Sequence, residues 1–280
     1  MLPVATDLLT DDEFALFRTL IYDEAGIALR PERRAFLASR VRNRLHARGL
    51  RSPYQYYRLL NDGAQGKDEL LHFLDLLTIN ETSFFRNAPQ FELLRARVLP
   101  ELLDRKARHG ETALRIWSAG CATGEEPYSL AMTMAEQHPA ARGVTPRIYA
   151  SDISLTALEF AQRGVYPEAK VRGVPAPLRE RHFQRRDGAY TVREDLKRPI
   201  VFDYHNLKHE NGLTRLDIIF CRNVMIYFDE AEQRRLVDKF HRALGPEGYV
   251  FLGHAESLQG FGSAFRFLYV NNGIAYQKVA

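Results

Sequence analysis

The chain has 280 residues, of which 45% are hydrophobic and 26% charged, and its formal net charge at pH 7 is +4. These values are ordinary for a globular protein, and the length is too great for one small core, so we expect one or two domains. No window approaches 18 uninterrupted apolar residues, which excludes a membrane-spanning helix.

The N-terminus and the cysteine content favour a cytoplasmic protein. The first residues carry early acids and no basic leader, so we expect no signal peptide. The two cysteines, Cys121 and Cys221, are then expected to be free thiols in a reducing compartment.

Residues 1–80 are predicted to form an all-helical domain, because they contain short amphipathic segments and no strand-like alternation. After a first helix, the next is expected from Pro31 to Gly49, since proline favours the start of a helix and glycine the position just past its end. Two more helices are expected, from Ser52 to Leu60 and at 69–79.

The helix that starts at Pro31 carries an excess of positive charge. Nine arginines lie between Arg30 and Arg58, against one acid, Glu32. A solvated helix face would explain some of them, but such faces usually mix both signs of charge, so the imbalance favours a docking surface for an acidic partner. The arginines expected to point outward beside the buried leucine and valine stripe are Arg33, Arg40, Arg44 and Arg48.

Residues 81–110 are expected to link this domain to a second one. The junction NETSFFR at 80–86 is polar and then aromatic, and a helix from Pro89 to Arg108 follows it.

Residues 111–280 are predicted to form an α/β domain, because short apolar runs alternate with helical segments. This pattern is typical of a Rossmann-like sheet of mostly parallel strands, and a C-terminal hairpin around Asn272-Gly273 would complete seven strands. An insertion at about 165–200, with a turn at Asp187-Gly188, is expected to form a small antiparallel β appendage. The predicted strands are 114–117, 147–152, 201–206, 216–221, 249–253, 266–270 and 274–277.

The loop after the first predicted strand is typical of nucleotide-type ligands. Gly120 and Gly124 precede a helix that opens with Glu125 and Glu126. A phosphate-binding P-loop needs GxxxxGK[ST], whereas these glycines are four apart and acids replace the lysine. The GxGxxG fingerprint of dinucleotides is also absent. Of the ligands commonly bound by such a loop, S-adenosylmethionine is the remaining candidate. It is cationic and lacks phosphate, so nearby acids would favour its binding.

Asp152, at the end of the second predicted strand, is placed to accept both ribose hydroxyls of such a ligand. Glu125, Glu126 and Asp152 could also have purely structural roles in place of ligand binding. Thr123 and Glu126 fit a capping box, Glu125 would complement the helix dipole, and Asp152 would cap the next helix.

A polar and aromatic run, CRNVMIYFD at 221–229, follows the fourth predicted strand. That strand is central in a doubly wound sheet, where ligands bind at the carboxyl ends of strands. Arg222, Asn223 and Tyr227 are therefore candidates to line the pocket, and Tyr227 offers its ring to a cation or adenine. A packed loop aromatic is the alternative for Tyr227, and Cys221 is expected to be a small buried hydrophobe.

Absent motifs narrow the class of enzyme. The sequence lacks the Asp/Asn-Pro-Pro-Tyr motif of amino-directed base methyltransferases and the Pro-Cys of cytosine-carbon methylation. No spacing of histidines and cysteines predicts a metal site.

Several long motifs, in one order along nearly the whole chain, closely resemble the chemotaxis-receptor glutamate O-methyltransferases of the CheR type. They are NETSFFRN, IWSAGCATGEEPYSLAM, ASDIS, IIFCRNVMIYFD and GHAES, after an arginine-rich helical region. The resemblance implies methyl transfer from S-adenosylmethionine to glutamate side chains on the helical cytoplasmic bundles of chemoreceptors, with S-adenosylhomocysteine as product. It also implies that the N-terminal domain docks on the receptor.

Carried over to this sequence, the resemblance implies a cofactor site made by the junction, the glycine loop and the ends of three strands. Its residues would be Asn80, Thr82, Arg86, Gly120, Glu126, Asp152, Asn206, Leu207, Arg222 and Asn223. Some members grip a receptor tether peptide with the appendage, but the hairpin at 184–192 is a few residues shorter here, which weakens that expectation.

A glutamate carboxylate is already ionised at pH 7, so its methylation needs no general base. It needs in-line positioning and removal from water. Arg86 is the candidate to hold one carboxylate oxygen while the other attacks, with Tyr227 beside the methyl group. The alternative for Arg86 is a salt bridge that only joins the two domains.

Two other interpretations remain. A nucleic-acid methyltransferase would use the arginine helix on phosphates, and a non-catalytic module would bind S-adenosylmethionine without transfer. We favour the receptor methyltransferase, with no nucleic acid or membrane as partner, and the sequence demands no more than a monomer.

Overall fold

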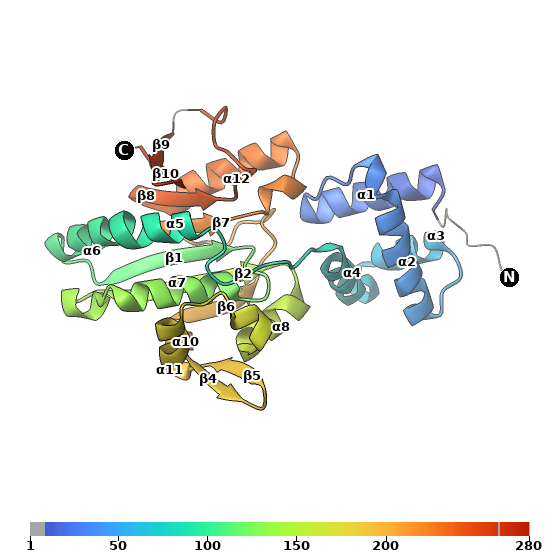
Figure 1. Ribbon diagram of the computed structural model, residues 1–280. Coiled ribbons are helices and arrows are strands. Elements are labelled where there is room, and N and C mark those ends of the chain that lie inside the picture. Colours follow the sequence, from blue (N-terminus) through green and yellow to red (C-terminus); the bar gives the residue numbers. More distant parts are fainter. Residues whose placement is uncertain (1–8, 263, 280) are drawn as a thin grey trace.

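The computed structural model describes residues 9–262 and 264–279, which form a helical domain followed by an α/β domain (Figure 1). Residues 1–8, where the predicted helical domain begins, lie outside the described part. Figure 1 shows the helical domain beyond one end of the sheet, with the strands β4 (Phe183–Arg186) and β5 (Ala189–Val192) of the appendage at one side of the α/β domain. None of the helices in the described part of the chain has the length and apolar character that a membrane crossing needs.

The helical domain contains the four predicted helices. A capping box of Thr10 and Glu13 begins the first, and the first two end at Gly26 and Gly49, whose φ angles are +72° and +65°. The elements are α1 (Asp11–Ala25), a 3-10 turn η1 (Pro31–Arg33), α2 (Arg34–Arg48), α3 (Pro53–Leu60) and α4 (Gly63–Leu77).

The fourth helix begins at Gly63, well before the predicted start at Glu69. Gly66 lies in its first turn, where a Cβ atom would come within 2.1 Å of the carbonyl oxygen of Leu59. The close contact between α3 and α4 therefore requires glycine inside a helix, against its low intrinsic propensity.

A buried carboxylate ties α2, α3 and α4 together. Glu69 is fully buried and accepts two hydrogen bonds from Arg44, at 2.6 and 2.7 Å. Arg48 donates a third at 2.5 Å, and the Tyr56 hydroxyl a fourth at 2.7 Å. Burial alone would raise the pKa of Glu69, but these donors lower it to about 2.

This network corrects the predicted arginine face. The Arg44 side chain is only 20% exposed because it lies against Glu69, so the prediction that it points outward is wrong. Arg48 is 43% exposed and also paired with Glu69. Arg33 and Arg40 instead lie over the ring of Phe36, at 5.5 and 4.1 Å from its centroid.

The α/β domain has the predicted Rossmann-like sheet of seven strands, in the order β6-β2-β1-β7-β8-β10-β9. The first five strands in this order are parallel, and β10 pairs antiparallel with β8 and β9. The strands are β1 (Ala113–Ala119), β2 (Thr145–Asp152), β6 (Ile200–Tyr204), β7 (Leu216–Cys221), β8 (Leu244–Leu252), β9 (Phe265–Val270) and β10 (Gly273–Lys278).

Helices cover both faces of the sheet. Because strand side chains alternate, Ile218 and Phe220 of β7 pack under α5 to α7, while Ile219 and Cys221 pack under α12. Trp117 of β1 is fully buried on the α12 side. The helices are α5 (Ala88–Leu93), a π-helical turn η2 (Leu94–Val98), α6 (Leu99–Arg108), α7 (Glu125–Glu136), η3 (Pro139–Arg142), α8 (Leu155–Arg163), η4 (Met225–Tyr227) and α12 (Glu230–Ala243).

The insertion forms the predicted antiparallel appendage. Its turn is at Asp187-Gly188, where both residues have positive φ, as a type I′ hairpin requires. A third, three-residue strand was not predicted. The appendage consists of β3 (Val165–Pro167), β4 (Phe183–Arg186) and β5 (Ala189–Val192), with short helices α9 (Glu168–Val171), α10 (Ala176–His182) and α11 (Glu194–Lys197).

The C-terminal hairpin turns one residue earlier than predicted. Asn271 and Asn272 both have positive φ and make the turn, and Gly273 already pairs with Val270. A Cβ atom on Gly273 would lie 2.5 Å from the carbonyl oxygen of Pro89, so this glycine serves the contact between β10 and α5.

We predict that Glu69→Ala lowers the free energy of unfolding by about 3–5 kcal/mol, because the guanidinium groups of Arg44 and Arg48 lose their buried carboxylate partner. Urea unfolding of the full chain measures this. The matched control is Glu92→Ala, whose ion pair with Arg95 is half exposed and should contribute about 1 kcal/mol or less. Equal effects of the two substitutions would contradict the assignment.

The same carboxylate predicts a pH dependence. The folded pKa of Glu69, about 2, lies below its ordinary value of 4.5, so its stabilisation is complete above pH 4.5 and is lost as the pH falls toward 2. Between these values the wild-type chain should lose stability more steeply than Glu69→Gln.

Candidate active site

A cavity lies between the two domains, at the carboxyl ends of the parallel strands. The strand order reverses between β1 and β7, and this is where a doubly wound sheet binds ligands. The cavity encloses about 930 Å³, open solvent at its mouth included, which is within the range of small-molecule sites. Its walls come from the loops after β1, β2, β6 and β7, and from the helical domain at Ala25, Ile27 and 77–82.

The fold brings every residue predicted for the site to this one cavity, although they come from segments far apart in the sequence. They are Asn80, Thr82, Arg86, Gly120, Glu126, Asp152, Asn206, Leu207, Arg222, Asn223 and Tyr227.

The glycine loop passes directly against the loop that follows β7. Gly120 has a φ of +81°, and a Cβ atom there would lie 2.4 Å from Cγ2 of Val224. Gly124 has a φ of +92°, and its Cβ would lie 2.7 Å from that of Ala161 in α8. Both glycines are therefore required by backbone angle and by space.

Asp152 is buried at the cavity wall. Its Oδ2 atom accepts the N–H of Ala122 and its Oδ1 atom that of Ser154, both at 2.8 Å. Burial raises the pKa of Asp152, although these hydrogen bonds favour the ionised form. Ser154, and not Asp152, caps α8, so the capping alternative is wrong, and each carboxylate oxygen keeps a lone pair for a ligand.

The two glutamates of α7 have different environments. Glu126 accepts hydrogen bonds from the Ser118 hydroxyl and from Nε of Arg222, both at 2.7 Å. Glu125 is buried, pairs with Lys170 at 2.9 Å and does not line the cavity. Neither carboxylate caps the helix, so the capping-box alternative is wrong.

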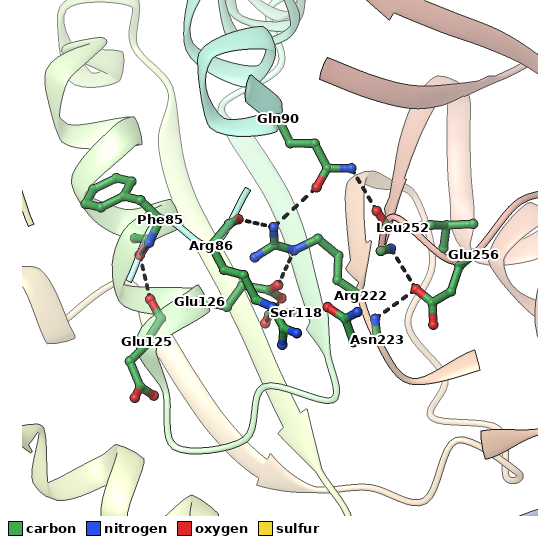
Figure 2. Close-up of polar contacts among 12 residues, drawn as sticks. Phe85, Arg86, Gln90, Ser118, Glu125, Glu126, Arg222, Asn223, Leu252 and Glu256 are labelled. Carbon is green, nitrogen blue, oxygen red and sulfur yellow. Dashed lines mark hydrogen bonds and ion pairs between the residues drawn. The ribbon is translucent and has the colours of Figure 1, made fainter. Parts of the chain in front are cut away.

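The Arg222 guanidinium is buried, and its Nε and Nη1 atoms donate to protein acceptors. Besides Glu126 it binds the carbonyl oxygen of Arg86 and, at 3.2 Å, Oε1 of Gln90. The Gln90 amide in turn donates to the carbonyl oxygen of Leu252, at 2.7 Å. Figure 2 shows this chain of contacts, which fastens the junction at 80–86 to β7 and β8.

Arg86 and Tyr227 both line the cavity. The Arg86 side chain donates to the carbonyl oxygen of Glu81 at 3.0 Å and has no carboxylate partner in the described part of the chain, so the domain-joining salt bridge is not found. Burial and the charge of Glu256 raise the pKa of Tyr227, against the opposing charges of Arg33 and Arg86. The phenol is therefore protonated at pH 7.

The helical domain contributes contacts that the sequence did not reveal. The Ala28 N–H donates to the carbonyl oxygen of Tyr227 at 2.8 Å, beside an isolated bridge between Ile27 and Phe228. The Asn206 amide donates to the carbonyl oxygen of Glu24 at 2.6 Å. The end of α1 therefore forms part of the wall, and the side chain of Asn206 holds it there.

Comparison with known proteins decides the family. The model of the CheR methyltransferase all-alpha domain matches residues 12–78, and that of the CheR methyltransferase SAM binding domain matches residues 80–274. The chain belongs to the CheR methyltransferase family. It is an enzyme that depends on S-adenosylmethionine.

Curated relatives match over most of their length. A chemotaxis protein methyltransferase of Borreliella burgdorferi is 34% identical over 256 residues, 90% of each chain. Chemotaxis protein methyltransferase 2 of Vibrio cholerae is 35% identical, covering 97% of this chain and 94% of its own. The Escherichia coli chemotaxis protein methyltransferase is 37% identical, covering 89% and 85%.

The cavity of this CheR family member fits S-adenosylmethionine. Asp152 offers carboxylate lone pairs to hydroxyl groups, and Gly120 lines the same cavity, with Val224 of the loop after β7 packed against it. The carboxylates of Asp152 and Glu126 in the wall would repel a phosphate. No group of metal-ligating side chains is found among the described residues.

We predict that Gly120→Ala weakens S-adenosylhomocysteine binding by roughly tenfold or more, because the new methyl group would push Val224 and the loop after β7 out of place. Isothermal titration calorimetry measures the affinity. Gly143→Ala is the control, since Gly143 also has positive φ (+69°) but has no atom within 4 Å of an added Cβ. A similar loss of affinity in both variants would mean that backbone strain alone is responsible.

Proposed function

We propose that this enzyme methylates glutamate side chains on the cytoplasmic helices of chemoreceptors, giving methyl esters and S-adenosylhomocysteine. The observation that carries the proposal is Arg86, an exposed guanidinium at the cofactor cavity without a carboxylate partner among the described residues, close to Tyr227. The names of the curated relatives support the chemotaxis role.

S-Adenosylmethionine supplies the methyl group when it is bound. Arg86 would bind one oxygen of the acceptor carboxylate and leave the other free to attack, as a charge-assisted hydrogen bond permits. Tyr227 stays protonated and so orients groups without acting as a base. A carboxylate needs no base at pH 7, and positioning alone is worth about 7–11 kcal/mol in well-aligned systems.

Each cofactor residue then has a proposed task. Asp152 would accept the ribose hydroxyls, and Glu126 would face the amino group with its charge partly neutralised by Arg222. The side chains of Asn80 and Asn206 already bind Ser154 and α1, so they would shape the wall and present backbone groups. Thr82, Leu207, Arg222 and Asn223 would complete the site.

The receptor would dock on the helical domain, within residues 1–80. Arg33 and Arg40 are the proposed contacts, together with the exposed part of Arg48. Arg44 would support this surface from inside through Glu69. Residues 81–110 would link it to the methyltransferase domain at 111–280.

We propose further that the enzyme acts as a cytoplasmic monomer. The appendage hairpin has strands of only four residues, β4 and β5, and we assign no tether peptide to it.

Methyl transfer to receptor cytoplasmic fragments tests the function. Tritiated S-adenosylmethionine should label the fragment, and mild alkali should release the label as methanol, as a methyl ester does. A fragment with its acceptor glutamates replaced by alanine is the control. Label that resists alkali, or label in nucleic acid instead, would overturn the proposal.

We predict that Arg33→Glu with Arg40→Glu lowers kcat/KM for the receptor fragment by roughly tenfold or more, since both charges would then repel an acidic partner. Binding of S-adenosylhomocysteine should stay unchanged. The charge-matched control is Arg95→Glu with Arg97→Glu, on the exposed surface of η2. Full methylation by the first variant would place the docking surface elsewhere.

A further inference from the structure

The GHAES motif at 253–257 has no task in the proposed mechanism, yet its glutamate is anchored to the active site. Oε2 of Glu256 accepts the backbone N–H of Gly253 at 2.6 Å and that of Asn223 at 2.8 Å. Oε1 accepts the N–H of Ile226 at 3.3 Å. Figure 2 shows the carboxylate between the end of β8 and the loop after β7.

The backbone around this carboxylate is shaped to receive it. A Cβ atom on Gly253 would lie 2.7 Å from Oε2 of Glu256 and 2.9 Å from the Asn223 nitrogen, so only glycine leaves room. Asn223 itself has a φ of +61°, a conformation that needs support from its surroundings. The carboxylate gives that support by binding the Asn223 N–H.

The segment that Glu256 holds is the one that lines the cavity. Asn223, Val224 and Tyr227 are lining residues, whereas Glu256 is not, so it acts on the site through the loop. Two other contacts hold the loop by its carbonyl groups: Gln233 donates to Met225 at 2.9 Å, and Ala28 donates to Tyr227. Among the side chains of the described residues, Glu256 alone accepts the loop's N–H groups at Asn223 and Ile226.

We propose that Glu256 is a positioning residue that fixes the 223–227 loop, and with it Tyr227, against the end of β8. The catalytic part of this inference rests on the proposed function, in which Tyr227 lies beside the transferred methyl group. The structural part, the fixed loop, does not depend on it.

The substitutions Glu256→Ala and Glu256→Gln separate this role from general stability. Alanine removes all three hydrogen bonds, whereas glutamine keeps a carbonyl oxygen for Gly253 and Asn223 and loses the acceptor for Ile226. The matched control is Asp217→Asn. Asp217 is a buried carboxylate at the opposite end of β7 that accepts the Arg115 N–H at 2.7 Å and pairs with Lys106.

In tritiated methyl transfer to the receptor fragment, Glu256→Ala should lower kcat by roughly tenfold or more, because small displacements of positioned groups slow a reaction strongly. Its affinity for S-adenosylhomocysteine should fall as well, because Asn223 and Val224 of the freed loop line the cofactor cavity. The Glu256→Gln variant should keep most of the wild-type kcat. Asp217→Asn should lower the melting temperature and leave kcat per folded enzyme unchanged.

Hydrogen–deuterium exchange of the backbone tests the loop without a substrate. In Glu256→Ala, exchange should rise by roughly tenfold within 222–228, while the appendage and α2 stay unchanged. Unchanged exchange in the loop, or a kcat that falls only in step with stability as in Asp217→Asn, would overturn the inference. If the wild-type enzyme labels no receptor, the proposed function fails, and the exchange data still decide whether Glu256 fixes the loop.

Discussion

The buried guanidinium of Arg222 is the constraint on which the active site depends. A cation removed from water is stable only when acceptors surround it, and here they come from three separate segments. Glu126 lies on α7, the carbonyl of Arg86 belongs to the junction, and Gln90 lies on α5. Because one planar group binds all three, it connects the junction that carries Arg86 to α5, α7 and the end of β7.

The helical domain also contains a buried charged group surrounded by hydrogen-bond partners, but there the group is an anion. Glu69 is a buried anion surrounded by donors from α2 and α3, and it draws Arg44 inward. The charge that a receptor can reach is therefore smaller than the arginine count suggests. The arginines of η1 and α2 divide into those that hold the domain together and those, such as Arg33, that remain available at the surface.

The sequence predicted the parts of the fold that depend on local pattern. The strand at 216–221 is continuously apolar but for Asp217, and it is a fully buried parallel strand. The Asp187-Gly188 turn also followed from its residues. Both features are specified by neighbours in the chain, which is why a single sequence suffices to find them.

Contacts between distant segments could not be predicted in this way. Gly66 resembles a loop residue, and only the close packing of α3 explains its place in a helix. Glu125 and Glu126 are neighbours of the same type, yet Glu125 forms an ion pair with Lys170 and Glu126 forms one with Arg222. Asp152, Arg222 and Asn223 followed from their places at strand ends, whereas the family resemblance supplied Asn80, Thr82, Asn206 and Leu207. Gln90, whose contacts lie more than a hundred positions away, gave no signal of its own.

Several hydrogen bonds connect the helical domain to the loops that line the cofactor cavity. The last carbonyls of α1 are bound by Asn206 and by Lys208, which reaches Tyr22 at 2.9 Å. On the other side, Asp75 of α4 accepts the Ser154 hydroxyl, and Ser154 donates its N–H to Asp152. The domain proposed to dock the receptor is therefore hydrogen-bonded directly to the loops after β2 and β6, which line the cofactor cavity. A helix bundle bound to α2 would be placed relative to Tyr227 by the same contacts that close the cavity.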